Sequence, residues 1–171
     1  METLKDKIRH VPDFPKAGIL FYDITTLLRD ATGFRAVVDS LALPFSASGI
    51  DLVIGIESRG FILGGAVADR LGTGFSPVRK PGKLPSTTVR ETYALEYGTD
   101  ALEIHDDGVT PGQRVLIVDD VIATGGTAKA TAALVRRLGG SVEGLAFLIE
   151  LVALNGRAQL EGEQVFSVLR Y

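Results

Sequence analysis

The chain has 171 residues, of which 46% are hydrophobic and 23% are charged, a balance typical of one soluble globular domain. Eighteen Lys and Arg residues against 21 Asp and Glu residues give a net charge of −3, which argues against a generally basic surface for nucleic acid or an anionic membrane. The chain has no cysteine, so disulfide frameworks and thiolate metal sites are excluded.

No targeting or membrane signal is evident along the chain. Residues 1–11 are charged and lack an apolar run, and no stretch reaches the roughly 20 apolar residues of a membrane helix. His10 and His105 lie far apart and have no second ligand at helical spacing, so we expect no metal site built by the protein. We expect a cytoplasmic protein that binds any anionic ligand through a local cluster of groups.

The first part of the chain predicts two helices. Leu4 and Ile8 can share one face of a short helix, after which residues 11–18 break regularity with prolines and a glycine. Apolar residues within 34–41 recur at i, i+3, i+4 and i+7, which predicts an amphipathic helix that ends before Pro44.

The middle of the chain alternates strand and helix patterns. Residues 51–56 (DLVIGI) are apolar without alternation, as in a strand covered on both faces of a parallel sheet. Residues 60–71 predict a buried helix, in which Gly64 and Gly65 let the helix lie close to the sheet at some cost in helix propensity. Residues 75–78 predict a brief second strand.

A basic loop and a hairpin come next. Residues 80–85 (KPGKLP) contain two lysines and two prolines. Residues 89–97 and 102–104 alternate in part, with Gly-Thr-Asp between them, which predicts a hairpin or mobile flap.

The last third of the chain predicts three strands and two helices. The strands are at 115–118 (VLIV), 145–149 and 165–169, and the helices are at 127–138 and 156–160. Strand, helix and strand in succession predict an α/β domain with a mostly parallel central sheet flanked by helices.

The segment between the VLIV strand and the next helix carries the chemistry. Ligands of open α/β sheets bind at the carboxyl ends of strands, and a helix that begins there offers unpaired N–H groups and the positive end of its dipole. Adjacent glycines let the backbone wrap a phosphate, and threonines add hydroxyl donors. We therefore predict a monophosphate site from these residues: Ala123, Thr124, Gly125, Gly126 and Thr127.

Asp119 and Asp120 indicate a different partner beside the phosphate. Two carboxylates repel an anion unless it carries hydroxyls or a metal, and a ribose diol supplies two donors that carboxylates accept. A lone Gly-Gly is usually a plain turn, and paired acids are usually solvated. A buried strand followed by two acids, the Ala-Thr-Gly-Gly-Thr loop and a helix is far more specific, and it predicts a clamp for ribose 5-phosphate. The chain contains no GxGxxG and no GxxxxGK[ST], so a Rossmann site and a Walker site lose their main support.

Residues 115–127 (VLIVDDVIATGGT) resemble the phosphoribosyl pyrophosphate motif of type I phosphoribosyltransferases. Further segments resemble the adenine-specific branch of that family, in order along nearly the whole chain: residues 12–25 (PDFPKAGILFYDIT), 57–60 (ESRG), 78–85 (VRKPGKLP), 93–98 (YALEYG) and 102–105 (LEIH). The resemblance implies the type I fold as one domain over residues 1–171. It also implies a small hood, from residues 1–30 and a C-terminal segment, and a mobile flap at residues 80–105.

By this resemblance the chain transfers a phosphoribosyl group from phosphoribosyl pyrophosphate to adenine, with AMP and pyrophosphate as products. The resemblance also implies Mg²⁺ held mainly through substrate oxygens, and a homodimer. It assigns the ribose hydroxyls to Asp119 and Asp120 and the 5-phosphate to residues 123–127. Pyrophosphate is assigned to two basic clusters: Ser58, Arg59, Arg79, Lys80 and Lys83.

The resemblance further implies a proton-handling acid and a base pocket. Glu96, with Tyr97 beside it, acts at the purine under the closed flap, where exclusion of water raises the pKa of a carboxyl. Arg59, in a turn that often has a strained peptide in the family, stabilises the leaving group. The flat base lies under the hood against apolar walls formed by Leu20, Phe21, Tyr22 and Leu151. Many family members carry Arg or Lys where this chain has Tyr22, so adenine preference is secure only if the backbone reads the base there.

Three alternatives stay open. An enzyme of the same fold could act on xanthine, hypoxanthine or orotate, since the hood decides the base. A regulatory protein could sense phosphoribosyl pyrophosphate, although it would need a basic face or an added nucleic-acid-binding element. A nucleotide-binding protein without catalysis is disfavoured because the flap acid, the basic loop and Arg59 occur together.

Overall fold

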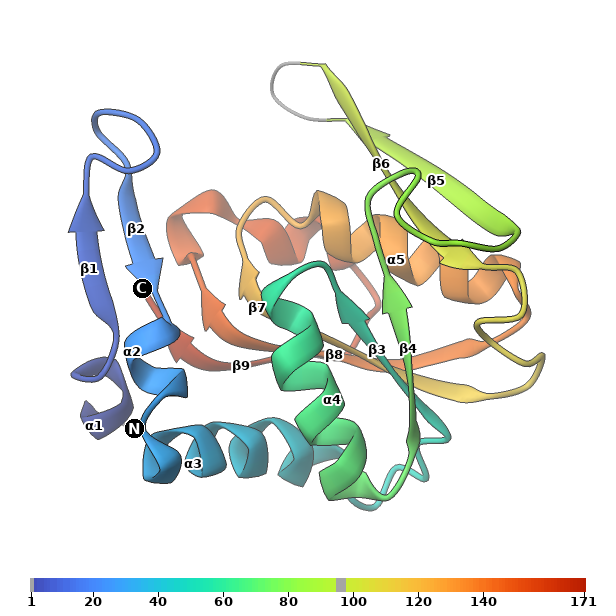
Figure 1. The fold of residues 1–171 in the computed structure, drawn as a ribbon, viewed down its shortest axis with the longest axis horizontal. Helices are drawn as coiled ribbons and strands as arrows, with labels where there is room; N and C mark the ends of the chain where they lie inside the picture. Colours follow the sequence, from blue (N-terminus) through green and yellow to red (C-terminus); the bar gives the residue numbers. More distant parts are fainter. Residues whose placement is uncertain (1, 95–97) are drawn as a thin grey trace.

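The structure, a computed structural model, describes residues 2–94 and 98–171 (Figure 1). Five strands form a central sheet in the order β4-β3-β7-β8-β9, and every neighbouring pair is parallel. Their bounds are Leu52–Ile56 for β3, Gly74–Val78 for β4, Arg114–Ile122 for β7, Ser141–Glu150 for β8 and Val165–Arg170 for β9. The predicted α/β class with a parallel central sheet is confirmed.

Helices cover both faces of this sheet. α3 (Ala31–Ala42) and α4 (Arg59–Leu71) pack on one face, and α5 (Gly126–Arg137) packs on the other (Figure 1). Every residue of β3 is buried, because a strand covered on both faces loses the alternation of polar and apolar residues. The helices and buried strands that the sequence predicts for this core are confirmed.

One glycine lets α4 approach β3. A Cβ built on Gly64 would lie 3.2 Å from the Cα of Gly55 in β3, whereas nothing lies within 4 Å of one built on Gly65. The prediction that both glycines permit the close approach is therefore right for Gly64 and wrong for Gly65. Gly72 ends the helix with a φ of 71°, a left-handed conformation that favours glycine.

Two antiparallel hairpins stand outside the central sheet (Figure 1). One pairs β1 (Arg9–Pro12) with β2 (Leu20–Asp23), and the other pairs β5 (Thr88–Ala94) with β6 (Thr99–His105). The sequence predicts the second hairpin but treats residues 11–18 as irregular, although β1 extends to Pro12. Each strand of the first hairpin has only four residues, and these do not alternate clearly between polar and apolar. The hairpin therefore cannot be recognised from the periodicity of the sequence.

Two strands exceed their predicted bounds. β7 continues to Ile122, so Asp119 and Asp120 lie within the strand instead of after it, and it pairs with β8 as far as Ile122 and Glu150. β6 begins at Thr99, where the sequence predicts a turn. In both places hydrogen bonds to a neighbouring strand override the local preference of polar residues for turns.

Short helices complete the described residues: α1 (Glu2–Lys5), α2 (Thr25–Leu28), and the 3₁₀ helices η1 (Leu43–Phe45), η2 (Val152–Leu154) and η3 (Gly156–Leu160). Leu4 and Ile8 are both buried as expected, although Ile8 lies beyond the end of α1. Among the described residues no helix has the length and apolar character needed to cross a membrane.

Candidate active site

Most of the residues predicted to bind the sugar, its phosphate and pyrophosphate lie at one edge of the sheet. The loops after β3, β4, β7 and β8 all emerge there, because parallel strands end on the same side (Figure 1). These loops carry, in chain order, the Ser58–Arg59 turn, the residues 79–85 that include Arg79, Lys80 and Lys83 and are called the basic loop from this point, the loop at residues 123–127, and Leu151. Figure 1 shows this edge flanked by the two hairpins.

The loop at residues 123–127, named the phosphate loop after the role that the sequence predicts for it, is shaped by glycine. Gly125 has a φ of 87°, a left-handed conformation that glycine adopts without steric cost, and α5 begins at the next residue. A Cβ on Gly125 would collide with the carbonyl oxygen of Gly156. The loop therefore presents backbone N–H groups at a helix N-terminus, an arrangement suited to an anion.

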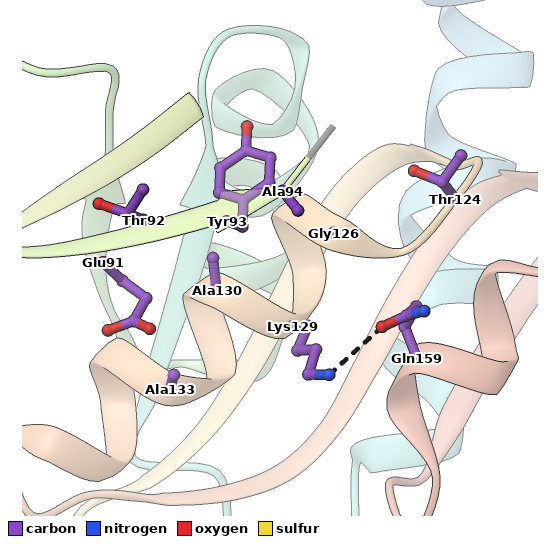
Figure 2. Close-up of a pocket in the computed structure, with 10 residues that line it drawn as sticks. All are labelled: Glu91, Thr92, Tyr93, Ala94, Thr124, Gly126, Lys129, Ala130, Ala133 and Gln159. Carbon is purple, nitrogen blue, oxygen red and sulfur yellow. Dashed lines mark hydrogen bonds between the residues drawn. The ribbon is translucent and has the colours of Figure 1, made fainter. Parts of the chain in front are cut away.

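The second hairpin lies against this loop. A Cβ on Gly126 would lie 3.1 Å from Cδ2 of Tyr93 in β5, so glycine allows the ring to approach the start of α5 (Figure 2). A groove of about 730 Å³ opens between β5 and α5, and Lys129 and Gln159 are hydrogen-bonded at 3.2 Å along it (Figure 2). Among the predicted ligands that the structure describes, only Thr124 and Gly126 line this groove, so it extends beyond the predicted site rather than coinciding with it.

Asp119 and Asp120 are both buried at the carboxyl end of β7, with 9% and 6% of their surfaces exposed. The backbone N–H of Asp120 donates to Oδ1 of Asp119 at 2.8 Å, and Nε of Arg59 donates to Oδ2 of Asp120. Burial, and then the charge of Asp120, raise the pKa of the Asp119 carboxyl well above its usual value. A Cβ on Gly60 would lie 2.8 Å from Oδ1 of Asp119, so glycine lets α4 start beside these acids.

Arg59 connects the acids to the N-terminal hairpin. Its side chain is 40% exposed, and its guanidinium lies 5.4 Å from the centre of the Phe21 ring. The residue before it, Ser58, occupies the N-cap position of α4 without a side-chain capping hydrogen bond, and the Glu57–Ser58 peptide bond is cis. The hydroxyl of Ser58 thus makes no capping contact at the helix start.

Arg79 and Lys80 in the basic loop are each paired with a carboxylate. Nε and Nη2 of Arg79 donate to the two carboxylate oxygens of Glu57, both at 3.2 Å, and these bonds hold the pKa of Glu57 below its usual value. Nζ of Lys80 donates to Asp100 and, at 3.2 Å, to the hydroxyl of Tyr93. Burial alone would lower the pKa of Lys80, but these hydrogen bonds outweigh it and raise the pKa.

Lys83 differs from these two cations. The residue is exposed, and its backbone carbonyl accepts a hydrogen bond of 3.1 Å from Nη1 of Arg79. Arg79 therefore ties the basic loop to the end of β3 through Glu57 and also holds the backbone of the loop. The structure places Lys83 at the solvent side of the cluster.

The predicted base-contacting residues of β2 face different surroundings. Phe21 lies beside Arg59, with the Phe14 ring 5.1 Å away. Tyr22 packs instead on Tyr171, with ring centres 4.2 Å apart. Successive side chains of a strand point to opposite faces, so Phe21 faces Arg59 while Tyr22 faces the C-terminal Tyr171.

Leu20 and Leu151 flank this surface. Leu20 is 44% exposed near the end of the first hairpin. Leu151 is half-buried directly after β8, and its N–H donates to the carbonyl of Ile122 at 3.0 Å. Leu151 therefore lies beside the end of β7, close to the start of the phosphate loop.

Two predicted residues, Glu96 and Tyr97, lie outside the described residues. Within residues 2–94 and 98–171, no group of three or more His, Asp or Glu side chains could hold a metal ion. Two of the carboxylates at this edge are paired with cations of the chain itself, Asp120 with Arg59 and Glu57 with Arg79.

Sequence reasoning missed several residues that shape this edge. Glu57 belongs to the quoted ESRG segment, but its role as the partner of Arg79 and Lys80 was not predicted. The sequence pattern places Asp100 in a turn and Gly156 in a short helix, and it gives neither residue a role. Each acts through a residue far away in the sequence, so no local pattern marks it; only the acidic character of Glu57 beside a basic cluster was a usable signal.

Comparison with known proteins agrees with this geometry. The family model described as phosphoribosyl transferase domain matches residues 29–169. The adenine phosphoribosyltransferase of Acidobacterium capsulatum is 60% identical over 170 residues, which cover 99% of this chain and 94% of that protein. The adenine phosphoribosyltransferase of Solibacter usitatus is 59% identical over 171 residues, covering 100% of this chain and 99% of that protein.

Solved structures give the same result. The crystal structure of adenine phosphoribosyltransferase from Thermoanaerobacter pseudethanolicus has a TM-score of 0.97 at 52% identity and covers 99% of both chains. The enzyme from Saccharomyces cerevisiae, complexed with an imino-altritol bisphosphate and adenine, has a TM-score of 0.92 at 41% identity, covering 98% of this chain and 97% of that one. The chain therefore belongs to the phosphoribosyltransferase family and, within it, to the adenine phosphoribosyltransferases.

Proposed function

We propose that this chain transfers the 5-phosphoribosyl group of phosphoribosyl pyrophosphate to adenine, giving AMP and pyrophosphate in purine salvage. The observation that carries the proposal is the end of β7, where two buried carboxylates precede a glycine-shaped loop at the N-terminus of α5. The chain is 60% identical to an adenine phosphoribosyltransferase, and a relative of the same fold has been crystallised with adenine.

The end of β7 is suited to the part of the substrate that does not change. Asp119 and Asp120 would accept hydrogen bonds from the two ribose hydroxyls, and the backbone of the phosphate loop would donate to the 5-phosphate. Thr124 and Thr127 add hydroxyl donors at either end of the two glycines. Because the loop is already shaped by Gly125, little reorganisation is needed when the phosphate arrives.

The cationic groups are suited to the leaving pyrophosphate. Arg59 would contact it from the start of α4, and its catalytic role would be to stabilise the negative charge that develops there. Ser58, Arg79, Lys80 and Lys83 would hold it before it leaves. Since Arg59, Arg79 and Lys80 are each paired with a carboxylate, pyrophosphate binding would exchange those partners for phosphate oxygens.

The chemical step breaks the bond between the anomeric carbon and a pyrophosphate oxygen, and that oxygen keeps the electron pair. The N9 nitrogen of adenine forms the new bond from the opposite side while the sugar gains oxocarbenium character. N9 loses its proton in the reaction, and we assign this proton to Glu96, with Tyr97 beside it. The assignment of these two residues depends on their match to the family pattern YALEYG.

The base would lie between the first hairpin and the end of β8. We propose that the β1–β2 hairpin, together with the segment that ends at Tyr171, forms the hood, and that Leu20, Phe21 and Leu151 contribute apolar walls. The packing of Tyr22 on Tyr171 supports a role for its backbone, not its ring, in reading the base. This arrangement reconciles adenine preference with the absence of Arg or Lys at that position.

Magnesium would take most of its ligands from substrate oxygens and water. Hard oxygen donors suit Mg²⁺, and Asp119 and Asp120 are the carboxylates nearest to the proposed ribose site, although Arg59 already occupies Asp120. When bound, the ion would add positive charge beside the departing pyrophosphate. The chain's own contribution would be to orient the sugar and to supply the positive charges of Arg59 and the basic loop to the leaving group.

We also propose a homodimer in the cytoplasm. Ile62 on α4 and Phe75 on the edge strand β4 are 49% and 37% exposed, and Phe61 packs edge-on against Phe75 at 6.1 Å. Exposed apolar side chains on α4 and on the edge strand β4 support self-association through this side of the molecule. Sedimentation of the purified chain tests the dimer, and a monomer at micromolar concentration would contradict it.

One assay tests the proposed activity. Purified protein with adenine, phosphoribosyl pyrophosphate and Mg²⁺ should produce AMP and pyrophosphate in equal amounts. Hypoxanthine, xanthine, guanine and orotate serve as competing bases, and faster turnover of any of them would overturn the adenine assignment. Binding of phosphoribosyl pyrophosphate without product from any base would favour the sensor alternative.

A second assay separates the two anion sites. Lys83→Ala should raise the KM for phosphoribosyl pyrophosphate by roughly fivefold to twentyfold, about 1–2 kcal/mol for a lost charge-assisted contact. AMP lacks the pyrophosphate, so its Kd should change much less. Equal losses for both ligands would contradict the assignment of Lys83 to pyrophosphate.

A further inference from the structure

The back of the phosphate loop rests on η3, a segment to which the proposed function gives no role. A Cβ on Gly156 would collide with the carbonyl oxygen of Ala123, and one on Gly125 would collide with the carbonyl oxygen of Gly156. The backbone of η3 is therefore in direct contact with the loop at two places, Ala123 and Gly125. In an interior packed this tightly, a shift of Gly156 moves the loop as well.

Arg157 fixes the position of this contact. Its guanidinium forms a two-pronged pair with Glu150, with Nε to Oε1 at 2.6 Å and Nη2 to Oε2 at 2.8 Å. Nη1 donates to the carbonyl of Val165 at 2.7 Å, and Nη2 also donates to Oγ of Ser167 at 3.1 Å. Four hydrogen bonds from one planar group thus join η3 to β8 and β9, which lysine could not reproduce.

Glu150 connects this pair to the active-site edge. It is the last residue of β8, it lies in register with Ile122 at the end of β7, and only 5% of its surface is exposed. The hydrogen bonds from Arg157 lower its pKa to about 2, with a smaller contribution from Ser167, although burial opposes them. The carboxylate is therefore charged at neutral pH, and the following residue, Leu151, bonds to the carbonyl of Ile122.

We propose that Arg157 is a positioning residue for the phosphate loop: its pair with Glu150 holds Gly156 against Ala123 and Gly125, so that the loop is preformed before substrate binds. The inference rests on the proposed assignment of residues 123–127 to the 5-phosphate. Arg157 touches no substrate in this scheme and acts only through the backbone of η3.

This role predicts a selective defect. Ligands that carry a 5-phosphate, such as AMP, ribose 5-phosphate and phosphoribosyl pyrophosphate, depend on the loop, whereas free adenine and free pyrophosphate do not. Displacing a loop by a fraction of an ångström weakens several phosphate contacts together, so the effect on these ligands is large. A merely structural role would lower stability without separating the two classes of ligand.

The test compares Arg157→Ala and Arg157→Lys with Arg136→Ala. Arg136 forms a single ion pair with Glu163 beyond the far end of η3, so its loss removes an arginine and an ion pair near η3 without touching Glu150. Titration calorimetry gives the Kd of AMP, steady-state assays give kcat and the KM of each substrate, and thermal unfolding reports stability. Arg157→Ala should raise the Kd of AMP and the KM of phosphoribosyl pyrophosphate by about tenfold to a hundredfold, with the KM of adenine within about twofold.

Arg157→Lys keeps one charged donor and should recover part of the AMP affinity, whereas Arg136→Ala should bind AMP as the parent does. If Arg157→Ala does not fold, Arg157→Lys and Glu150→Gln provide the same comparison with smaller changes. Unchanged AMP affinity in all folded Arg157 and Glu150 variants would overturn the inference, as would equal losses for adenine and AMP. Failure of the parent protein to bind AMP would instead overturn the proposed function.

Discussion

The phosphate loop and the basic loop lie at the same edge of the sheet, but they are built in opposite ways. The phosphate loop offers backbone N–H groups: Gly125 forms its turn, α5 begins at the next residue, and Gly156 packs against its back. The basic loop offers charged side chains: Arg79 and Lys80 follow the end of β4, and each forms a hydrogen bond with a carboxylate. Both suit phosphate oxygens, through N–H dipoles in one case and full charges in the other.

The difference shows two ways of preparing an anion site. A backbone site needs no counter-ion, because partial charges on N–H groups are satisfied by water when it is empty. A cluster of full charges is stabilised by acids from the same chain, and these must be displaced when the ligand binds. The first site should therefore be sensitive to shape and the second to charge. The proposed mechanism is consistent with this division, since in it the 5-phosphate would stay bound to the phosphate loop throughout the reaction while pyrophosphate would leave the basic loop.

The sharpest test of the shape-dependent region is Gly125→Ala. The added methyl would collide with Gly156 and would require a φ of 87° from an L residue, so the loop must move. We expect kcat/KM for phosphoribosyl pyrophosphate to fall at least about a hundredfold, the effect of an ångström-scale misplacement. Steady-state kinetics with saturating adenine measures this loss.

Gly162→Ala is the matched control for that variant. Gly162 has a φ of 85°, but nothing lies within 4 Å of a Cβ built there. It should lose about 1 kcal/mol of stability from backbone strain and keep the parent kcat/KM. If both variants lost activity equally, shape at the phosphate loop would not be the reason.

Asp119→Asn tests the buried acid at the end of β7, which precedes the phosphate loop and lies next to Asp120, the partner of Arg59. Burial and the charge of Asp120 raise the pKa of Asp119, so the folded state keeps this proton to a higher pH than the unfolded state does. The carboxylate therefore costs stability as pH rises above about 3.9, the usual Asp value. Asparagine removes that cost and keeps the acceptor for the N–H of Asp120, so the variant should be more stable than the parent at pH 7–8, with the gain vanishing near pH 4.

The same variant should lose activity, by about tenfold in kcat/KM, because a ribose hydroxyl would lose a charged acceptor. Thermal unfolding across pH and steady-state kinetics measure the two effects. A variant that is less stable than the parent at pH 8 would show that the buried carboxylate is compensated in the folded protein. Unchanged kcat/KM would remove Asp119 from the ribose site.

Asp100→Asn probes the charge-dependent region and should have the smallest effect. Asp100 holds the ammonium of Lys80, and pyrophosphate would have to displace it. Weakening this partly exposed pair, normally worth 0.2–1 kcal/mol, should lower the KM for phosphoribosyl pyrophosphate by up to about fivefold. Asp39→Asn, which breaks an exposed pair with Arg70 between α3 and α4, should leave the KM unchanged. A raised KM in Asp100→Asn would mean that Asp100 positions Lys80 instead of competing for it.

Residues close together in sequence account for what could be predicted. The buried strands β3, β7 and β8 could be predicted because each contains a run of consecutive apolar residues. The proposed ribose and phosphate sites could be predicted because their acids and glycines lie within residues 119–127. The hairpin at β1 was missed because its strands are too short to show a period. The roles of Glu57 and Asp100 were missed because an acid in isolation does not reveal which cation it will hold.

The sequence by itself determined the α/β order, the phosphate loop and the identity of its neighbouring acids, because turn chemistry and burial patterns are local properties. Tertiary structure decided the rest. The pairing of Arg59 with Asp120 joins residues 61 apart, and the support of Gly125 by Gly156 depends on where β8 ends. The face of β2 that Tyr22 occupies was settled by Tyr171. Such contacts form only when whole helices and strands pack closely together, so the sequence of any one segment does not reveal them.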